Sequence, residues 1–426
     1  VCSTDEDEVA AAGDDIENGD EALADEYLCL GCGAISEKRA PTFCECSPET
    51  PRIVLRRLVL DHNHLRRCVC CSSMHGGQVI YRLLTGKDAP ISVLATSLYQ
   101  SLPPDREEHM PPLPGGGRKL LSFADSRQDA AFLAPYIEGS YERFLQRALI
   151  LKALQADDPA RHGSLRADDL VSRMMPLAES AGLFETSSSR DYQRRQVLTW
   201  LMREFTALDT RINLEGLGLL HLRLVRPPDW RPPAPLLDAP WQLTPDEAWD
   251  LIALLLDSLR QQGVVTFPPN IDPCDEAFAP RNVKLYVRQE SVIKQHILGW
   301  APKTDKHSNR RLDYLSRLLQ KRASLSASEA RSAARKALNG LWNAITDTHW
   351  ELLGVEKLPV VGVVYQTPHN LWEWVPPAEN NTPIYRCTRC TAVAYHNLSG
   401  VCPTNGCDGE LERVDNCTDA WRDNHY

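Results

Sequence analysis

The chain has 426 residues, 43% of them hydrophobic, and a formal net charge of −10 at pH 7. From this length and composition we expect two to four domains with substantial hydrophobic cores. The longest strongly apolar run, residues 251–256, is far shorter than the ~20 residues needed to cross a bilayer, which excludes a membrane-spanning helix. The sequence therefore predicts a soluble protein without a membrane partner.

Residues 1–26 carry eleven acidic and no basic side chains. Without them the chain has 47 basic and 46 acidic groups, so the net charge does not argue against a nucleic-acid partner. A segment this acidic, with few large apolar residues, is typical of disordered chain. We therefore expect residues 1–26 to be a disordered acidic lead-in.

A first zinc-ribbon domain is predicted over residues 27–100. Cys29 and Cys32 form a C-x2-C-G knuckle, and Cys68 and Cys71 form a second C-x2-C pair. Four thiolates from two knuckles are a usual ligand set of a tetrahedral structural Zn²⁺. We favour these four ligands because ribbons pair two similar knuckles at strand ends.

Three further cysteines leave other ligand sets open in this domain. Cys44 and Cys46 could replace the second knuckle or hold another ion with His62 or His64, and Cys70 is the third. Disulfides would require an oxidising compartment. The sequence starts VCSTDEDEV, without a secretory segment, so we expect reduced thiols and a cytoplasmic protein.

A change of character follows the first cysteine cluster. Residues 101–117, SLPPDREEHMPPLPGGG, are rich in proline and glycine and predict a linker. Residues 118–155 then predict a short apolar strand at 120–123 and a long helix with Ser126 as its N-cap. A strand that ends in a polar turn at a helix N-terminus is typical of α/β domains that bind ligands at the carboxyl edge of the sheet.

The residues LLSFADSRQDAAFLA, 120–134, resemble motif IV of superfamily two DEAD/DEAH-type helicases. The Ser-Phe-x-Asp-Ser-Arg-Gln-Asp-Ala form is similar to that of very large bacterial helicases with cysteine-rich insertions, some of them linked to phage defence or DNA repair. In that group a segment like residues 88–96 precedes the motif, and a ribbon like residues 385–411 follows a helical insert.

The resemblance implies several properties of the parent protein. Residues 118–155 would open its second RecA-like domain, and the protein would use ATP and Mg²⁺. Its partners would be nucleic acid, with DNA favoured over RNA, the rest of the helicase motor and, in defence systems, further subunits. It also implies that Ser126, Arg127 and Gln128 lie near the nucleic-acid backbone, where helix N–H groups and a basic side chain favour phosphate. The alternative is that Arg127 only pairs with Asp125 or Asp129.

The chain lacks the parts of a helicase that handle ATP. No Gly-x-x-x-x-Gly-Lys-Ser/Thr occurs, and Gly86-Lys87 is followed by Asp88. Residues 275–278, Asp-Glu-Ala-Phe, do not follow an apolar strand, so we interpret their likeness to an Asp-Glu-Ala-Asp box as coincidence. We therefore expect no catalytic residue and no ATP site here; the chain resembles the middle of a helicase and is not expected to be active alone.

Residues 156–380 predict a mostly helical insertion domain. Thr244 is a good N-cap, with Pro245 at the first helical position, and Trp230 is interpreted as a packing anchor in the proline-rich segment 226–235. Apolar residues on one face of a helix over 192–207 predict a core contact: Val197, Leu198, Leu201, Met202 and Phe205.

Residues 303–336 have ten basic and three acidic side chains. Such a face can neutralise phosphates independently of base sequence. The alternative is a solvated helix face beside a buried stripe of Leu312, Leu315, Leu318 and Leu319. The candidate nucleic-acid contacts in this stretch are Arg310, Arg311, Arg317, Lys321 and Arg322.

A second zinc ribbon is predicted over residues 381–426. Cys387 and Cys390 form a C-x2-C knuckle, and after eleven residues Cys402 and Cys407 form a C-x4-C knuckle. Because four cysteines leave no open coordination position, we expect a structural Zn²⁺ and about two zinc ions in the whole chain.

We therefore predict an α+β multidomain protein in which zinc ribbons flank part of a RecA-like α/β domain with a mostly helical insertion. The predicted function is to supply zinc-stabilised accessory domains and nucleic-acid contacts to an ATP-dependent helicase or translocase. The alternative is a non-enzymatic zinc-ribbon scaffold that recruits protein or nucleic-acid partners.

Overall fold

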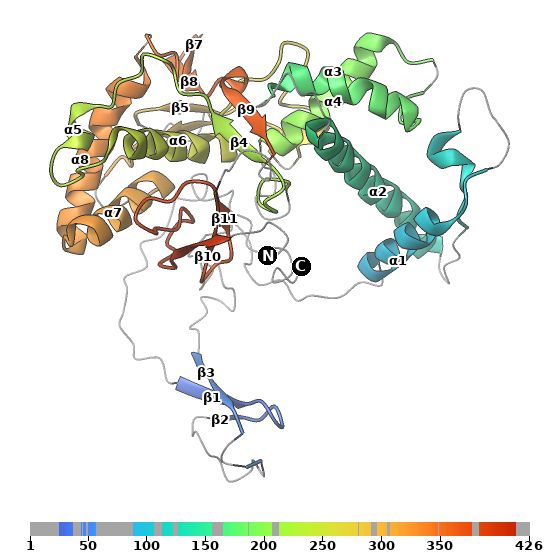
Figure 1. The fold of residues 1–426 in the computed structure, drawn as a ribbon, viewed down its shortest axis with the longest axis horizontal. Helices are drawn as coiled ribbons and strands as arrows, with labels where there is room; N and C mark the ends of the chain where they lie inside the picture. Colours follow the sequence, from blue (N-terminus) through green and yellow to red (C-terminus); the bar gives the residue numbers. More distant parts are fainter. Residues whose placement is uncertain are drawn as a thin grey trace.

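The computed structural model describes residues 25–36, 44, 46–47, 50–56, 88–105, 113–121, 127–155, 165–185, 187–206, 213–279, 281–290, 296–304, 307–347, 349–376 and 383–414. These residues form helices and four small sheets, so the mixed α+β class is confirmed (Figure 1). None of the helices in these ranges combines the length and apolarity needed to cross a membrane.

The first sheet carries the first cysteine cluster. Its strands are β1 (Asp25–Cys29), β2 (Ile35–Ser36) and β3 (Arg52–Arg56), paired antiparallel in the order β2-β1-β3. A turn at Gly33, whose φ of 74° suits glycine, connects β1 to β2. This sheet lies apart from the other sheets in Figure 1.

Two helices follow along the chain, α1 (Asp88–Ser101) and α2 (Arg127–Gln155), with the 3₁₀ turn η1 (Pro114–Gly117) between them. The rings of Tyr99 and Tyr141 meet edge to face at 5.4 Å where α1 packs on α2. Leu120 and Leu121 belong to no strand, and Leu121 is 85% exposed. The strand predicted at 120–123 is therefore wrong for its first two residues, and the other two lie outside the described residues.

The helical body contains α3 (Ala167–Ser180), α4 (Arg190–Phe205), the short α5 (Ala234–Leu237), α6 (Pro245–Gln261), α7 (Arg310–Ala323) and α8 (Ala327–Ile345). The apolar face predicted between 192 and 207 is buried on α4, which confirms it. Thr244 and Glu247 form a reciprocal capping box at the start of α6. Trp230 is buried edge to face against Trp249 at 5.0 Å, as a packing anchor should be.

Two sheets contribute residues to the core of this body. β4 (His221–Leu224) pairs antiparallel with β9 (Trp372–Val375). The other sheet has the order β6-β5-β8-β7, with β5 (Tyr286–Arg288), β6 (Ile297–Gly299), β7 (Gly354–Leu358) and β8 (Gly362–Gln366). The remaining 3₁₀ turns are η2 (Glu276–Phe278) and η4 (His369–Leu371). In η2 the Asp275 carboxylate caps the Ala277 N–H, so the Asp-Glu-Ala-Phe run is a turn.

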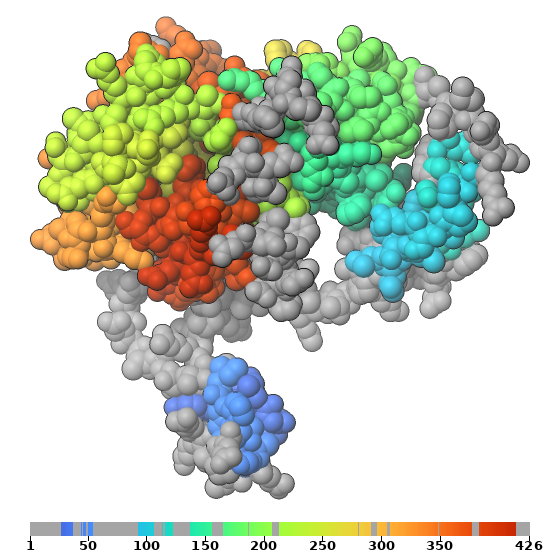
Figure 2. Space-filling view, in the orientation of Figure 1, coloured from blue at the N-terminus to red at the C-terminus, as the bar shows by residue number. Residues whose placement is uncertain are grey.

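The last sheet is the C-terminal ribbon, β10 (Ile384–Cys387), β11 (Val393–Ala394) and β12 (Leu411–Val414) in the order β11-β10-β12. One hydrophobic core runs from Leu149 near the end of α2 to Leu398 and Val401 of the ribbon. The core includes residues on both sides of position 155, from the end of α2 and from α3. The end of α2, the helical body and the ribbon therefore share one hydrophobic core. In the space-filling view the ribbon, in red, lies directly against the helical body (Figure 2).

Candidate metal centres and the ribbon–body interface

The four C-terminal cysteines converge as the sequence predicts. Their sulfurs lie within 4.8 Å of one another, and all four residues are buried. Sγ–Sγ separations of 3.6 Å for Cys387–Cys407 and 3.5 Å for Cys390–Cys402 are far longer than the ~2.05 Å of a disulfide. They match the edge of about 3.8 Å expected when four sulfurs surround Zn²⁺ at ~2.3 Å. This cluster could hold a zinc ion, with no position left for substrate.

The knuckle backbone leaves no room for a side chain at Gly409. A Cβ there would lie 2.5 Å from Cys387 Sγ and 2.7 Å from Arg389 Cβ. The Arg389 N–H approaches Cys387 Sγ at 3.4 Å from the same turn. Glycine at 409 is therefore a steric requirement of the sulfur cluster.

Gly409→Ala is expected to destabilise the ribbon by about 1–3 kcal/mol or more, because the added methyl overlaps a ligand sulfur. Zinc retention against a mild chelator and thermal unfolding measure the effect. Gly340→Ala is the matched control, since a Cβ at this position of α8 meets nothing within 4 Å, and it should stabilise the protein by about 0.5–1 kcal/mol. Equal zinc retention in the two variants would contradict the steric argument.

The thiols of this cluster do not ionise independently. The hydrogen bond from Cys402 lowers the pKa of Cys390 to about 4, and the same contact raises the pKa of Cys402. Burial raises the pKa of Cys407 to about 12. Because zinc binds thiolates, filling the site must release the protons that these sulfurs retain without a metal.

The N-terminal cluster brings together Cys29, Cys32, Cys44 and Cys46, whose sulfurs also lie within 4.8 Å of one another. Cys32 Sγ and Cys44 Sγ are 3.6 Å apart. The backbone N–H groups of Cys32 and Gly31 lower the pKa of Cys29 to about 6, which favours the thiolate that a metal needs. This group could also hold a zinc ion.

Of the two ligand sets weighed for the first ribbon, the structure assembles the one in which Cys44 and Cys46 complete the site. Cys29 and Cys32 belong to both sets. Cys68 and Cys71, which the sequence favoured, lie outside the described residues, as do His62 and His64. Four sulfurs already satisfy a tetrahedral ion, so the assembled set needs no further ligand.

Arg317 joins α7 to the C-terminal ribbon. Its Nη1 donates to the carbonyl oxygens of Cys402 at 2.8 Å and Cys407 at 2.6 Å, and its Nη2 donates to that of Thr404 at 3.0 Å. Asp313, one turn earlier on α7, holds the guanidinium at 2.7 Å. Asp313 and the ribbon carbonyls thus engage the donors of Arg317 that the sequence predicts for phosphate, and its contact with nucleic acid stays a prediction.

Arg311 is also not a surface cation. It is 1% exposed and donates to the carbonyl oxygens of Gly299 at 2.6 Å and Trp300 at 3.0 Å. A nucleic-acid contact at Arg311 is therefore contradicted, because a phosphate cannot reach a buried guanidinium. The leucine stripe predicted beside it is confirmed, with all four side chains fully buried.

The other basic residues of α7 differ in their surroundings. Lys321 Nζ lies 2.5 Å from a Glu410 carboxylate oxygen of the ribbon. Arg322 donates to both carboxylate oxygens of Glu247 at 2.8 and 3.0 Å, and this bonding lowers the pKa of Glu247. Arg310 lines a cavity of about 150 Å³ between ribbon and body.

The motif IV positions are not tested. Ser126 and the side chains of Arg127 and Gln128 lie outside the described part of the chain, although α2 begins at Arg127. Their contact with nucleic acid stays a prediction.

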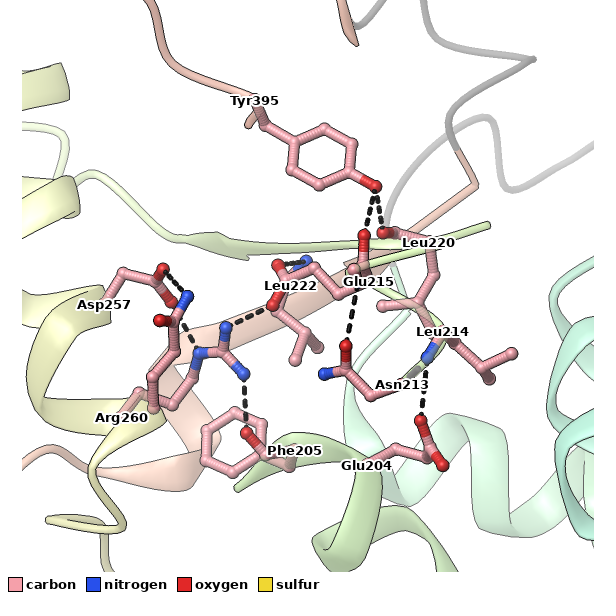
Figure 3. A network of polar contacts seen from close by, with 12 residues as sticks. Glu204, Phe205, Asn213, Leu214, Glu215, Leu220, Leu222, Asp257, Arg260 and Tyr395 are labelled. Atoms are coloured by element: carbon pink, nitrogen blue, oxygen red, sulfur yellow. Dashed lines mark hydrogen bonds and ion pairs between the residues drawn. The ribbon is translucent and has the colours of Figure 1, made fainter. Parts of the chain in front are cut away.

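A second set of contacts, which sequence reasoning missed, ties the ribbon to the loop before β4 (Figure 3). The Tyr395 hydroxyl donates toward the carbonyl oxygens of Leu220 at 2.6 Å and Glu215 at 3.1 Å. The Glu215 carboxylate accepts from the Leu222 N–H at 2.9 Å and pairs with Arg260 of α6. No spacing in the sequence relates residue 395 to residues 215–222.

Arg260 is the centre of that network. Its side chain is fully buried, pairs with Asp257 at 2.7 Å and donates to the Phe205 carbonyl oxygen at 2.5 Å. The guanidinium also stacks over the rings of Phe205 and Trp372. The contacts of residues 384–414 with α6, α7 and residues 213–224 are called the ribbon–body interface below.

His221 at this interface predicts a pH dependence of stability. It is 4% exposed, stacks on Tyr395 at 4.3 Å, and burial lowers its pKa well below the usual value. Below pH ~6.5 the unfolded chain gains a proton that the folded chain does not, so the free energy of unfolding should fall by up to about 1.4 kcal/mol per pH unit.

Urea unfolding between pH 7.5 and 5.5 measures the dependence, and His221→Phe should flatten part of it because the ring stack is kept and the titrating group is lost. Loss of zinc at low pH affects parent and variant alike. Parallel pH curves for the two proteins would exclude His221 as the cause.

Comparisons with family models, with curated proteins and with solved structures found no match. The function is therefore inferred from the residues and motifs of this chain.

Proposed function

We propose that this chain binds two structural zinc ions and forms a zinc-stabilised accessory region of an ATP-dependent DNA helicase or translocase. The observation that carries the zinc proposal is the convergence of four cysteine sulfurs at each of two places. Four sulfurs fill all the positions of a tetrahedral zinc ion. Closed four-thiolate sites hold a fold together and do not bind substrate.

The helicase part of the proposal is supported by the motif IV-like residues 120–134, which continue into α2. ATP and Mg²⁺ would bind to other parts of the parent protein, since the sequence of this chain contains no phosphate-binding loop. Within such a protein, the ribbon–body interface would fix the insertion to the ribbon as one unit. Cytoplasmic location and defence-system subunits belong to the same proposal.

Metal analysis and ATPase assays test the two parts separately. The purified chain should contain about two zinc ions and show no nucleic-acid-stimulated ATP hydrolysis, because nothing in it would hold the β- and γ-phosphates. In the full-length helicase, Arg127→Ala should weaken the stimulation of ATP hydrolysis by DNA while zinc content and unfolding stay unchanged. Unchanged stimulation would favour the alternative in which Arg127 only pairs with a neighbouring carboxylate.

A second candidate function is a zinc-ribbon scaffold that recruits a protein partner. It is favoured by the contacts of the basic residues on α7. Arg311 bonds buried carbonyl oxygens, and Arg317 and Lys321 bond the ribbon, so these side chains already have partners within the chain. A salt titration of DNA binding by the whole chain distinguishes the two. A helicase accessory should lose affinity steeply with salt, by about 0.7 to 0.9 in log K per log salt for each phosphate contact, whereas a protein scaffold should not bind DNA.

A further inference from the structure

The contact between Arg317 and the ribbon has an unusual target. The three carbonyl oxygens that accept from its guanidinium belong to Cys402, Thr404 and Cys407, all within the loop that supplies two of the four sulfurs. Arg317 therefore binds the backbone of a metal knuckle from a helix that is about 90 residues away in sequence. Arginine suits this task because its planar group offers five donors in a fixed fork.

Asp313 completes the arrangement from the same helix. Its Oδ2 accepts from Nε and Nη2 of Arg317 at 3.0 and 2.7 Å and also from the Gly406 N–H at 2.8 Å. Arg317 thus binds three carbonyl acceptors of the 402–407 loop, and Asp313 binds one N–H donor of the same loop. Both side chains are mostly buried, 16% and 22% exposed, so water competes weakly for these bonds.

The loop meets this pair in its knuckle conformation. Three carbonyls converge on one guanidinium when residues 402–407 fold as a knuckle, with Gly406 at a φ of 66°. The same conformation aims Cys402 Sγ and Cys407 Sγ inward at the other two sulfurs. A metal ion that joins the four sulfurs would therefore stabilise the conformation that Arg317 recognises, and Arg317 would stabilise the one that the metal requires.

We propose that zinc binding at Cys387, Cys390, Cys402 and Cys407 and docking of the ribbon on α7 are one coupled equilibrium, transmitted by Arg317 and Asp313. This inference rests on the proposed zinc occupancy of the cluster. By linkage, the factor by which docking tightens zinc binding equals the factor by which zinc tightens docking. Arg317 is thus a positioning residue of the metal site, and zinc loss weakens the docking of the 402–407 loop on α7.

A different polar link from α7 to the ribbon, Lys321–Glu410, provides a matched control. Lys321 and Glu410 are 40% and 69% exposed, and exposed ion pairs contribute little. Glu410 accepts this bond outside the 402–407 loop. Lys321→Ala therefore removes a charge and a ribbon contact from the same helix without touching the coupled loop.

The test uses the whole chain with Cys29, Cys32, Cys44 and Cys46 all replaced by serine, which removes the four-sulfur group of the first ribbon. Zinc affinity is measured by competition with a chromophoric chelator in this parent and in its Arg317→Ala, Arg317→Lys and Lys321→Ala variants. We expect Arg317→Ala to weaken zinc binding by about 10- to 100-fold, Arg317→Lys to lie between it and the parent, and Lys321→Ala to remain within about fivefold of the parent.

Hydrogen exchange supplies the reciprocal readout. Removing zinc from the parent should increase exchange in α7 and around Tyr395, and zinc-bound Arg317→Ala should show part of the same increase, while α3 and α4 stay protected. If Arg317→Ala fails to fold, the Arg317→Lys affinity decides. Equal zinc affinity in the parent and the arginine variants, together with hydrogen-exchange protection of α7 that does not depend on zinc, would overturn the coupling and leave the zinc proposal intact. If the parent binds no zinc, the zinc proposal itself is overturned.

Discussion

Replacing Cys390 with serine is expected to unfold the C-terminal ribbon locally and to remove one of the two proposed zinc ions. The residue is 4% exposed, its sulfur lies 3.5 Å from that of Cys402, and three sulfurs alone bind zinc less well than a complete tetrahedral set. Structural zinc binding supplies about 10–16 kcal/mol of folding free energy in small modules, so the loss should exceed that of any single core substitution.

Zinc content and hydrogen exchange over residues 384–414 measure this effect. Cys274→Ser is the control, because Cys274 is an exposed cysteine of neither cluster. It should keep two zinc ions and the protection of the parent. A Cys390→Ser protein with full zinc content and a protected ribbon would show that the four sulfurs do not form a metal site.

Replacing Arg260 with alanine should lower the free energy of unfolding by about 3–5 kcal/mol. The substitution leaves the carboxylates of Glu215 and Asp257 and the Phe205 carbonyl oxygen without their buried cation (Figure 3). Burial raises the pKa of Glu215 to about 7, so that residue is already costly to ionise in the folded protein. Without Arg260 the cost is uncompensated.

A double substitution separates the charge from the packing. Arg260→Met keeps much of the side-chain volume but leaves the buried Glu215 carboxylate without its cation. Adding Glu215→Gln should recover part of the lost free energy of unfolding, because the buried charge is removed. Arg194→Ala serves as the control, since Arg194 and its partner Asp168 are 46% and 82% exposed and should contribute no more than about 1 kcal/mol. A loss at Arg260 no larger than that at Arg194 would contradict the structural role of the network.

Features that depend on residues close together in the chain could be predicted from the amino-acid sequence. The spacing of Cys387, Cys390, Cys402 and Cys407 identified a metal-ligand set, because each knuckle is a local turn that presents two sulfurs. The Thr244 N-cap follows from a local cap signal, and the buried faces of α4 and α7 follow from 3.6-residue periodicity. The mixed α+β class followed from the same local signals.

The partners of the remaining groups follow from the folding of segments that are distant in sequence. From the sequence, Cys44 and Cys46 are an alternative to Cys68 and Cys71 as zinc ligands. In the structure β1 pairs with β3, and Cys44 and Cys46 lie beside Cys29 and Cys32. Arg311 and Arg317 look equivalent in a basic run.

The two arginines are six positions apart on the helix, which directs one guanidinium into the core at Trp300 and the other to carbonyls about 90 residues later. The Tyr395 bond to Leu220 spans 175 residues. Local spacing carries no information about such pairs, because they form only when burial in the shared core brings distant segments together and their polar groups must find partners there.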